Sequence, residues 1–381
     1  MKRHIRFFLL LGLALAAIPV AAAHAAPTID TQAEEAFLVD FDTGAVLLDK
    51  NADQPMPPSS MSKLMTTYIV FDRLQNKRLS LDDELTVSEK AWRMGGSKMF
   101  VEVGNQVRVE DLLRGVIIQS GNDACVVLAE GVAGSEEAFA ELMNEKAREF
   151  GMTGSHFTNA TGWPDPDQRV TARDLATLAR RTIVDHPEYY SYYGEKEFTW
   201  NEIRQGNRNP LLYRNIGADG LKTGHTEEAG YGLTASAVQN DRRLILVVNG
   251  LPSMQARADE SDRLLSWGFR EFDNYALFKA GETVDEAAVW LGAEETVPLV
   301  IPNDLKVTLP RSDRNGMQVS VVYDGPIPAP VAEGTEIARL RVTWPEGVPV
   351  EVPLLAGKEV EQLGPFGRIA ASIKFLVLGN P

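Results

Sequence analysis

Cysteine and histidine are scarce in this sequence of 381 residues: Cys125 is the single cysteine, and only five histidines are present. One cysteine cannot form a disulfide within the chain. The histidines are scattered, and neither an HExxH nor a CxxC pattern occurs. These absences exclude a disulfide framework and argue against a zinc site, so we expect the protein to use no metal and no cofactor.

Basic residues are also too few to balance the acidic ones, since 38 Lys and Arg face 53 Asp and Glu. The formal net charge of −15 repels a phosphate backbone, so we expect no nucleic-acid partner. A GxSxG motif is absent as well. Its absence argues against a serine hydrolase with a nucleophile elbow.

The first 29 residues contain no acidic residue, and basic residues at positions 2, 3 and 6 precede an apolar run over residues 7–20. Ala23-His24-Ala25 then fits a small-residue cleavage site. This order is typical of a secretory signal peptide, so we expect residues 1–25 to be removed and the protein to be exported. The net charge would then be −18, because three basic and no acidic residues are lost. The alternative is an uncleaved anchor, but its apolar stretch falls short of the roughly 17 residues that span a bilayer.

The pattern of the chain changes near residue 273. Helical and strand signals are mixed over residues 26–272, whereas residues 273–363 form short β-branched runs separated by Pro, Gly, Asn and Asp. A segment with both helical and strand patterns, followed by short strands separated by turn residues, predicts an α+β domain and then a small all-β domain.

The last segment, residues 364–381, has a helical pattern of its own. If it is helical, one stripe contains Phe366, Ile369, Ala370, Ile373, Leu376 and Val377. No acidic residue follows Glu361. A basic amphipathic helix of this length is too short to span a bilayer but suits its interface, so we expect a membrane anchor. A helix packed on the β domain is the alternative.

Three serines and a lysine lie close together in the stretch PPSSMSKLMTTYIV, residues 57–70. Apolar residues from Met61 to Ile69 follow helical spacing, and two prolines prevent a backward extension, so we expect the helix to begin at Ser59 or Ser60. Of the three serines, only Ser60 has a base three residues further on, which is Lys63. Such a pair faces the same side of a helix.

This spacing suits nucleophilic catalysis. A serine hydroxyl becomes an effective nucleophile when a neighbouring base takes its proton. A lysine is such a base only when it is neutral, and burial or a second cation lowers its pKa towards that state. The motif is common by chance, and a polar helix start is the alternative.

Two further motifs favour catalysis. Ser120-Gly121-Asn122 separates two helical patterns, and such a turn can direct both polar side chains at one site. Lys222-Thr223-Gly224 precedes a predicted antiparallel hairpin over residues 231–250, and this tripeptide is far rarer by chance than the other two motifs.

With the motifs SxxK, SxN and KTG in this order, the sequence resembles the penicillin-binding proteins and serine β-lactamases. It is most similar to the low-molecular-mass D-alanyl-D-alanine carboxypeptidases, and the likeness covers nearly all of residues 33–272. Five longer segments show the same likeness: AFLVDFDTGAVLLDKNADQPMPPSS, GVIIQSGNDACVVLAE, HFTNATG, ADGLKTGHTEEAGY and ESDRLLSWGFREF. The later β region and the amphipathic tail also match that family. The fold that the resemblance implies is a helical cluster with an antiparallel sheet, of the serine β-lactamase and transpeptidase type.

The resemblance implies a role for each motif residue. Ser60 would be acylated, with Lys63 as its base. Ser120 and Asn122 would carry protons and hold the substrate amide.

The remaining implied residues bind substrate. Lys222 and Thr223 would meet its terminal carboxylate, and Gly224 would bind substrate beside them. His225 would contribute its backbone N–H, together with that of Ser60, to an oxyanion hole. Arg257 fits a further carboxylate contact, although an arginine on a helix surface is the alternative. Cys125 would lie near the site, as a buried small residue rather than a reactive thiol.

The implied activity is removal of the terminal D-alanine from peptidoglycan stem pentapeptides, with β-lactam antibiotics acylating the same serine. The protein would act in the periplasm, with its tail on the outer face of the cytoplasmic membrane. A serine β-lactamase is one alternative, but its second carboxylate base is missing, because residues 156–170 contain no glutamate and Asp165 and Asp167 lack the expected surroundings. An inert cell-wall-binding protein is the other.

Overall fold

The computed structural model describes residues 28–378, so the expected signal peptide lies outside the described residues. The helices and strands of the first domain are β1 (Glu35–Asp40), β2 (Val46–Lys50), α1 (Lys63–Gln75), β3 (Glu84–Thr86), α2 (Glu89–Arg93), β4 (Gln106–Arg108), α3 (Val109–Ile117), α4 (Asn122–Ala133), α5 (Glu136–Glu149), α6 (Ala172–Asp185), α7 (Pro187–Tyr190), β5 (Glu197–Trp200), β6 (Ile203–Gly206), β7 (Ala218–Thr226), β8 (Gly230–Gln239), β9 (Arg242–Leu251) and α8 (Met254–Glu271).

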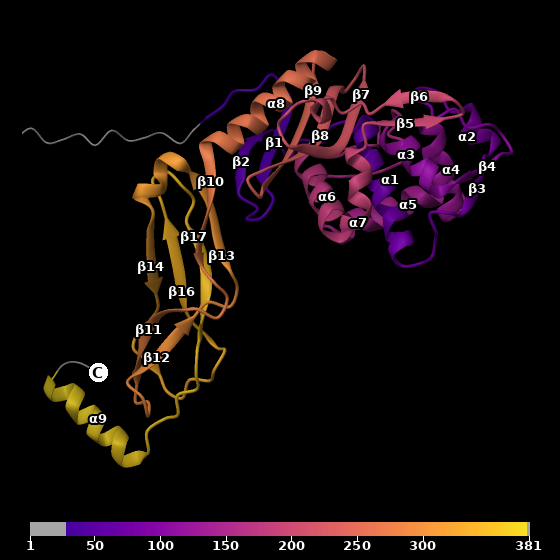
Figure 1. The fold of residues 1–381 in the computed structure, drawn as a ribbon. Helices are drawn as coiled ribbons and strands as arrows, with labels where there is room; N and C mark the ends of the chain where they lie inside the picture. The colour runs from indigo at the N-terminus through magenta and orange to yellow at the C-terminus, as the bar shows by residue number, and fades with distance from the viewer. Residues whose placement is uncertain (1–27, 379–381) are drawn as a thin grey trace, which may run out of the picture.

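An antiparallel sheet of order β2-β1-β9-β8-β7 forms the middle layer of this domain. Successive strand residues point to opposite faces. Accordingly, Ile245 and Val247 of β9 join the core shared with the helical cluster, whereas Leu244 and Leu246 join the core beneath α8. In Figure 1 the helical cluster and α8 lie on opposite sides of this sheet. The predicted combination of a helical cluster and an antiparallel sheet is confirmed.

The second domain is built from strands, as the sequence predicts. They are β10 (Phe272–Phe278), β11 (Thr283–Trp290), β12 (Thr296–Val300), β13 (Leu305–Pro310), β14 (Gln318–Val322), β15 (Ile327–Pro328), β16 (Glu336–Thr343) and β17 (Val350–Ala356). β10 pairs with β13, and the other six form a sheet of order β14-β16-β17-β12-β11-β15. Its apolar core is separate from the two cores of the first domain.

The tail forms the predicted helix, α9 (Pro365–Leu378), at the end of the β domain that is remote from the first domain (Figure 1). Phe366, Ile369 and Ile373 of the apolar stripe are 89%, 59% and 56% exposed. The β domain therefore does not cover these three side chains. Within residues 28–378, no helix combines the length and the apolar character needed to cross a membrane.

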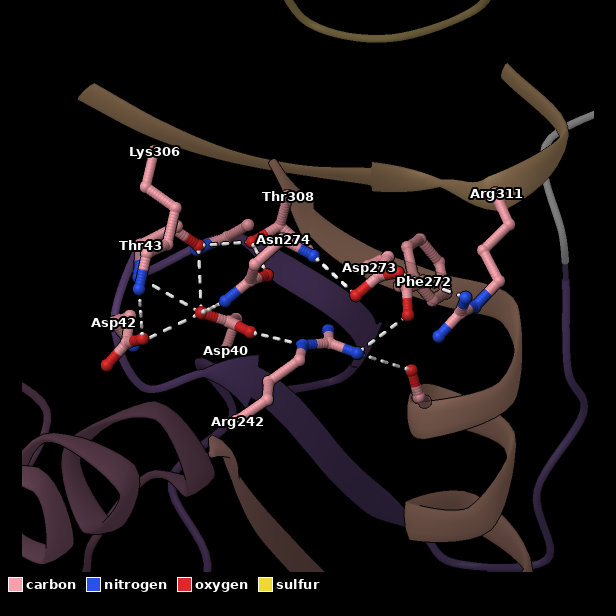
Figure 2. Close-up of polar contacts among 12 residues, drawn as sticks. Asp40, Asp42, Thr43, Arg242, Phe272, Asp273, Asn274, Lys306, Thr308 and Arg311 are labelled. Atoms are coloured by element: carbon pink, nitrogen blue, oxygen red, sulfur yellow. Dashed lines mark hydrogen bonds and ion pairs between the residues drawn. The ribbon is translucent and has the colours of Figure 1, made fainter. Parts of the chain in front are cut away.

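A buried ion pair between Asp40 of β1 and Arg242 of β9 lies where the first domain meets the second (Figure 2). Arg242 Nε donates to Asp40 Oδ2 at 2.8 Å, and its Nη1 donates to the carbonyls of Gly268 and Phe272 at 3.2 and 2.7 Å. Asn274 Nδ2 of β10 donates to Asp40 Oδ1 at 3.2 Å. The pair thus links the central sheet, the end of α8 and the first strand of the β domain.

Direct side-chain contacts extend this junction towards β13. Thr43 and Thr308 approach to 2.5 Å between their hydroxyl oxygens, and Thr308 donates to Asn274 Oδ1 at 2.7 Å. Lys306 forms an ion pair with Asp42 at 2.7 Å, but both side chains are about a third exposed or more. The buried and the exposed ion pair therefore offer a matched comparison.

We expect Arg242→Met to lower the free energy of unfolding by about 3–5 kcal/mol, because it leaves the Asp40 carboxylate buried without its cation. Lys306→Met removes an exposed pair and should cost about 0–1 kcal/mol. Urea unfolding followed by circular dichroism measures both. Equal losses in the two variants would contradict the larger contribution expected of the buried pair.

Candidate active site

Ser60 lies on a 3-10 turn rather than on the α-helix that the sequence predicts. The turn spans Ser59–Ser62, and α1 begins only at Lys63. The predicted start at Ser59 or Ser60 is therefore correct for the turn and wrong for the α-helix. The backbone of Ser59 has a φ of +49°, which departs from helical values. The tighter 3-10 winding still brings residue i close to residue i+3, so Ser60 and Lys63 remain neighbours.

The amine of Lys63 is the centre of the site. Its side chain is fully buried, and in its protonated form Nζ donates to Ser60 Oγ at 3.0 Å, Asn122 Oδ1 at 2.7 Å and the carbonyl oxygen of Thr161 at 2.5 Å. All three acceptors are neutral groups. Burial is the main cause that lowers the pKa of Lys63 to about 8; Arg208 acts in the same direction, whereas Cys125, Asp123 and Glu136 oppose it.

The Ser120-Gly121-Asn122 turn lies between α3 and α4, as predicted. Ser120 has a φ of +61°, and the carboxylate of Asp123 supports the turn by accepting the N–H groups of Met99 and Phe100, both at 2.8 Å. Asn122 Nδ2 donates to the carbonyl of Gly95 at 2.8 Å. This bond orients the amide so that its oxygen faces Lys63.

β7 carries Lys222, Thr223, Gly224 and His225 past the 3-10 turn of Ser60. Lys222 is buried and donates to Ser120 Oγ at 2.9 Å, which joins the second and third motifs. A Cβ on Gly224 would lie 3.1 Å from the carbonyl oxygen of Pro58, so the close approach of the strand favours glycine. The side chain of His225 is exposed and lies against Tyr231, with ring centroids 3.9 Å apart.

Lys222 has a strongly lowered pKa, first because it is buried and second because Lys63 is close. Burial is the largest cause for both lysines; among the neighbouring cations, Arg208 lowers the pKa of Lys63, and Lys63 and Arg208 lower that of Lys222. Two lysines and no bonded acid leave the site poorly able to hold two positive charges.

Arg257 lies in the first turn of α8 and is only 6% exposed. Its Nη1 donates to the carbonyl of Gly224 at 3.4 Å, and its guanidinium lies 5.7 Å from the centroid of the Tyr231 ring. The alternative of a surface arginine is therefore wrong.

A cleft of about 390 Å³ opens over these residues. It is lined by Ser60, Ser97, Ser120, Arg208, Thr223, Gly224, His225, Tyr231, Met254 and Arg257. Asn122 and the two lysines lie beneath it and reach it through the hydroxyls of Ser60 and Ser120. The predicted site residues therefore come together in one place.

Four residues that line the cleft were not predicted from the sequence: Ser97, Arg208, Tyr231 and Met254. Arg208 donates a hydrogen bond to Ser97 Oγ and stays charged, as arginine does in proteins. It lies in an irregular segment between β6 and β7, outside every motif. The sequence offers no signal that would distinguish it from a surface arginine.

Cys125 is a buried residue of α4, as expected. Its burial raises the pKa of the thiol to about 12, so it is protonated at neutral pH. Within residues 28–378, no three His, Cys, Asp or Glu side chains are grouped so as to hold a metal ion. The site itself presents a serine hydroxyl with a buried amine 3.0 Å away.

Comparisons with known proteins agree with this arrangement. The family model described as D-alanyl-D-alanine carboxypeptidase matches residues 20–253, and that of the penicillin-binding protein 5 C-terminal domain matches residues 272–362. The chain is 42% identical over 353 residues to D-alanyl-D-alanine carboxypeptidase DacC of Escherichia coli strain K12, which covers 90% of this chain and 88% of that protein.

Solved structures show the same similarity over both domains. Penicillin-binding protein 5 from Haemophilus influenzae superimposes with a TM-score of 0.81 at 38% identity, covering 88% of this chain and 99% of that one. The carboxypeptidase DacD from Francisella tularensis also gives 0.81, at 30% identity, covering 90% and 96%. The chain thus belongs to the D-alanyl-D-alanine carboxypeptidase family, with the C-terminal domain of penicillin-binding protein 5.

Proposed function

We propose that this protein is a serine-type carboxypeptidase that removes the terminal D-alanine from peptidoglycan stem pentapeptides through an acyl-enzyme on Ser60. The observation that carries this proposal is the fully buried amine of Lys63, 3.0 Å from the hydroxyl of Ser60. A base with a pKa near the working pH is best suited to proton transfer, and the pKa of Lys63 is about 8.

In the first step, neutral Lys63 accepts the proton of Ser60, and the serine oxygen attacks the carbonyl of the penultimate D-alanine. The backbone N–H groups of Ser60 and His225 stabilise the oxyanion. The leaving D-alanine takes a proton through Ser120, and Asn122 holds the amide of the acyl group. Water then hydrolyses the ester and releases the shortened peptide.

Substrate binding can itself help to activate Lys63. Lys222, Thr223 and Arg257 receive the terminal carboxylate, whose negative charge restores the positive charge of Lys222. A charged Lys222 then disfavours a second charge on Lys63. The substrate would thereby promote the neutral form of its own catalytic base.

The two alternatives differ in what happens to a β-lactam. A β-lactamase would hydrolyse it rapidly, but Asp165 is bonded to the backbone N–H of Asp167 rather than to a catalytic group. An inert wall-binding protein would form no adduct. The proposed enzyme forms a long-lived one.

The domain bounds that we propose are residues 1–25 for the signal peptide, 26–272 for the catalytic domain, 273–363 for the β domain and 364–381 for the anchor. The exposed stripe of α9 supports attachment to the outer face of the cytoplasmic membrane from the periplasm, because such a face suits the lipid interface. The β domain would hold the catalytic site away from the bilayer.

Incubation with a labelled penicillin should place one adduct on the tryptic peptide that contains residue 60, because Ser60 is the nucleophile. Ser60→Ala should form no adduct and release no D-alanine from diacetyl-Lys-D-Ala-D-Ala. Mass spectrometry and a D-alanine assay measure the two effects. Rapid turnover of penicillin, or an adduct on another peptide, contradicts the proposal.

The rate of acylation should rise with pH and level off above about 8, because only neutral Lys63 accepts a proton and its pKa is about 8. Below that value the rate should fall about tenfold for each pH unit. Stopped-flow measurement of penicilloylation from about pH 6 to about pH 10 gives the profile. Lys63→Arg should remain unacylated throughout, since arginine stays charged. A profile without a rising limb would exclude Lys63 as the base.

A chain that ends at Gly364 should be soluble and retain its D-alanine release, because the catalytic site lies in the other domain. The full mature chain should sediment with anionic lipid vesicles. Phe366→Ser should weaken that binding, whereas Ser372→Ala, which lies off the apolar stripe, should not. Vesicle binding by the shortened chain would contradict the anchor.

A further inference from the structure

The loop over residues 158–163 supplies the third acceptor of Lys63, and it lies outside the three motifs SxxK, SxN and KTG. The carbonyl oxygen of Thr161 lies 2.5 Å from Nζ, and the neighbouring carbonyl of Ala160 accepts from Thr66 Oγ1 of α1 at 2.6 Å. The loop also packs closely on the turn of the nucleophile. A Cβ on Gly162, whose φ is +79°, would lie 1.8 Å from the carbonyl oxygen of Ser59.

The Thr161 carbonyl matters because of the shape of an amine. A neutral amine has two N–H bonds and one lone pair in a tetrahedral arrangement. When the N–H groups point to Asn122 Oδ1 and to the Thr161 carbonyl, the lone pair points to Ser60 Oγ, where the proton must be accepted. A displaced carbonyl would leave the amine free to turn one N–H towards Ser60 instead.

Asn159 determines where that carbonyl lies. Its Oδ1 accepts the backbone N–H groups of Thr161, Gly162 and Trp163 at 3.2, 2.8 and 3.0 Å, together with the hydroxyl of Thr161 at 3.0 Å. Its Nδ2 donates to the carbonyl of Trp163 at 3.0 Å, which closes the loop. One side chain therefore holds three successive peptide units.

Asn159 is itself held by the protein. Its backbone N–H and that of Thr158 donate to Gln168 Oε1, both at 3.0 Å, and Gln168 is only 2% exposed. The N–H of Ala160 donates to Glu136 of α5 at 3.2 Å. The loop thus has fixed anchors on both sides of Thr161.

We propose that Asn159 is a positioning residue for the reaction: by holding the Thr161 carbonyl, it directs the lone pair of Lys63 at the hydroxyl of Ser60. The inference deepens the function proposed above and rests on it. An asparagine fits because its oxygen accepts four donors without adding a negative charge beside the buried amine.

Charge is the reason why aspartate cannot replace it at neutral pH. Lys63 is already influenced by Asp123 and Cys125 of α4, Glu136 of α5, Lys222 of β7 and Arg208. A carboxylate at position 159 would keep the four acceptor contacts but favour the ammonium form of Lys63. The rising limb of the acylation profile would then move to higher pH.

Two substitutions test the proposal in the full mature chain, with penicilloylation on Ser60 as the readout. Asn159→Ala removes the acceptor and should lower the acylation rate constant about ten- to a hundredfold at every pH, the size expected for a misplaced catalytic group. Asn159→Asp should move the rising limb upward by about one pH unit and regain near-native rates above it.

Asn144→Ala is the matched control. Asn144 binds the same segment upstream, with its side chain accepting from the N–H of Phe157 at 2.8 Å and donating to its carbonyl at 2.7 Å, but it does not bind Thr161. It should lower the melting temperature while the folded protein keeps the native rate and profile.

A native rate in Asn159→Ala, or an equal loss in Asn144→Ala, would overturn the proposal. If Asn159→Ala does not fold, Asn159→Asp decides alone, because an unmoved rising limb overturns the inference. The proposed function stays separable throughout, since the unmodified chain must still be acylated on Ser60.

Discussion

A buried amine bonded to three neutral oxygens is the constraint around which the catalytic domain is arranged. A charged lysine in such surroundings would lose its hydration without gaining an anion, so burial favours the neutral form that can act as a base. The three acceptors come from the 3-10 turn before α1, the start of α4 and the loop before α6. The helical cluster therefore serves to bring these three places to one nitrogen.

The central sheet completes the site from the other side. β7 is paired with β8 in a register that places Lys222 opposite Thr234 and Gly224 opposite Gly232, so the lysine is buried and the glycine meets the turn of Ser60. Two glycines, Gly162 and Gly224, stand where a Cβ would contact the backbone of that turn. Close backbone approach from two directions limits how far Ser60 can move.

The sequence predicts the parts of the site that depend on residue type at short spacing. Ser60 and Lys63, the Ser120 turn and the Lys222 strand are local patterns, and each lies where its surroundings imply. The order of the two domains along the chain and the terminal helix follow from the periodicity of apolar residues. The 3-10 turn before Lys63 was not predicted, because residues i and i+3 are neighbours in a 3-10 helix as well as in an α-helix.

What the sequence could not predict depends on backbone groups and on long-range packing. The Thr161 carbonyl has no residue-type signature, since every residue carries one. Arg208 comes from an irregular segment, and Arg257 is buried because the first turn of α8 brings it against Gly224 of β7 and Tyr231 of β8. The role of Asn159 likewise appears only when its oxygen is seen to accept four donors. These contacts are formed by the fold, so only the fold reveals them.

The distribution of charge along the molecule follows from the same arrangement. The chain is acidic overall, yet the guanidinium groups of Arg208 and Arg257 line one cleft. A low-dielectric cleft focuses their field, so an anionic peptide end is drawn to the one place where its carboxylate is matched. The acid-free helix α9 lies at the end of the β domain that is remote from this cleft. The uneven distribution of charge thus places the cationic cleft and the acid-free tail in different parts of the molecule.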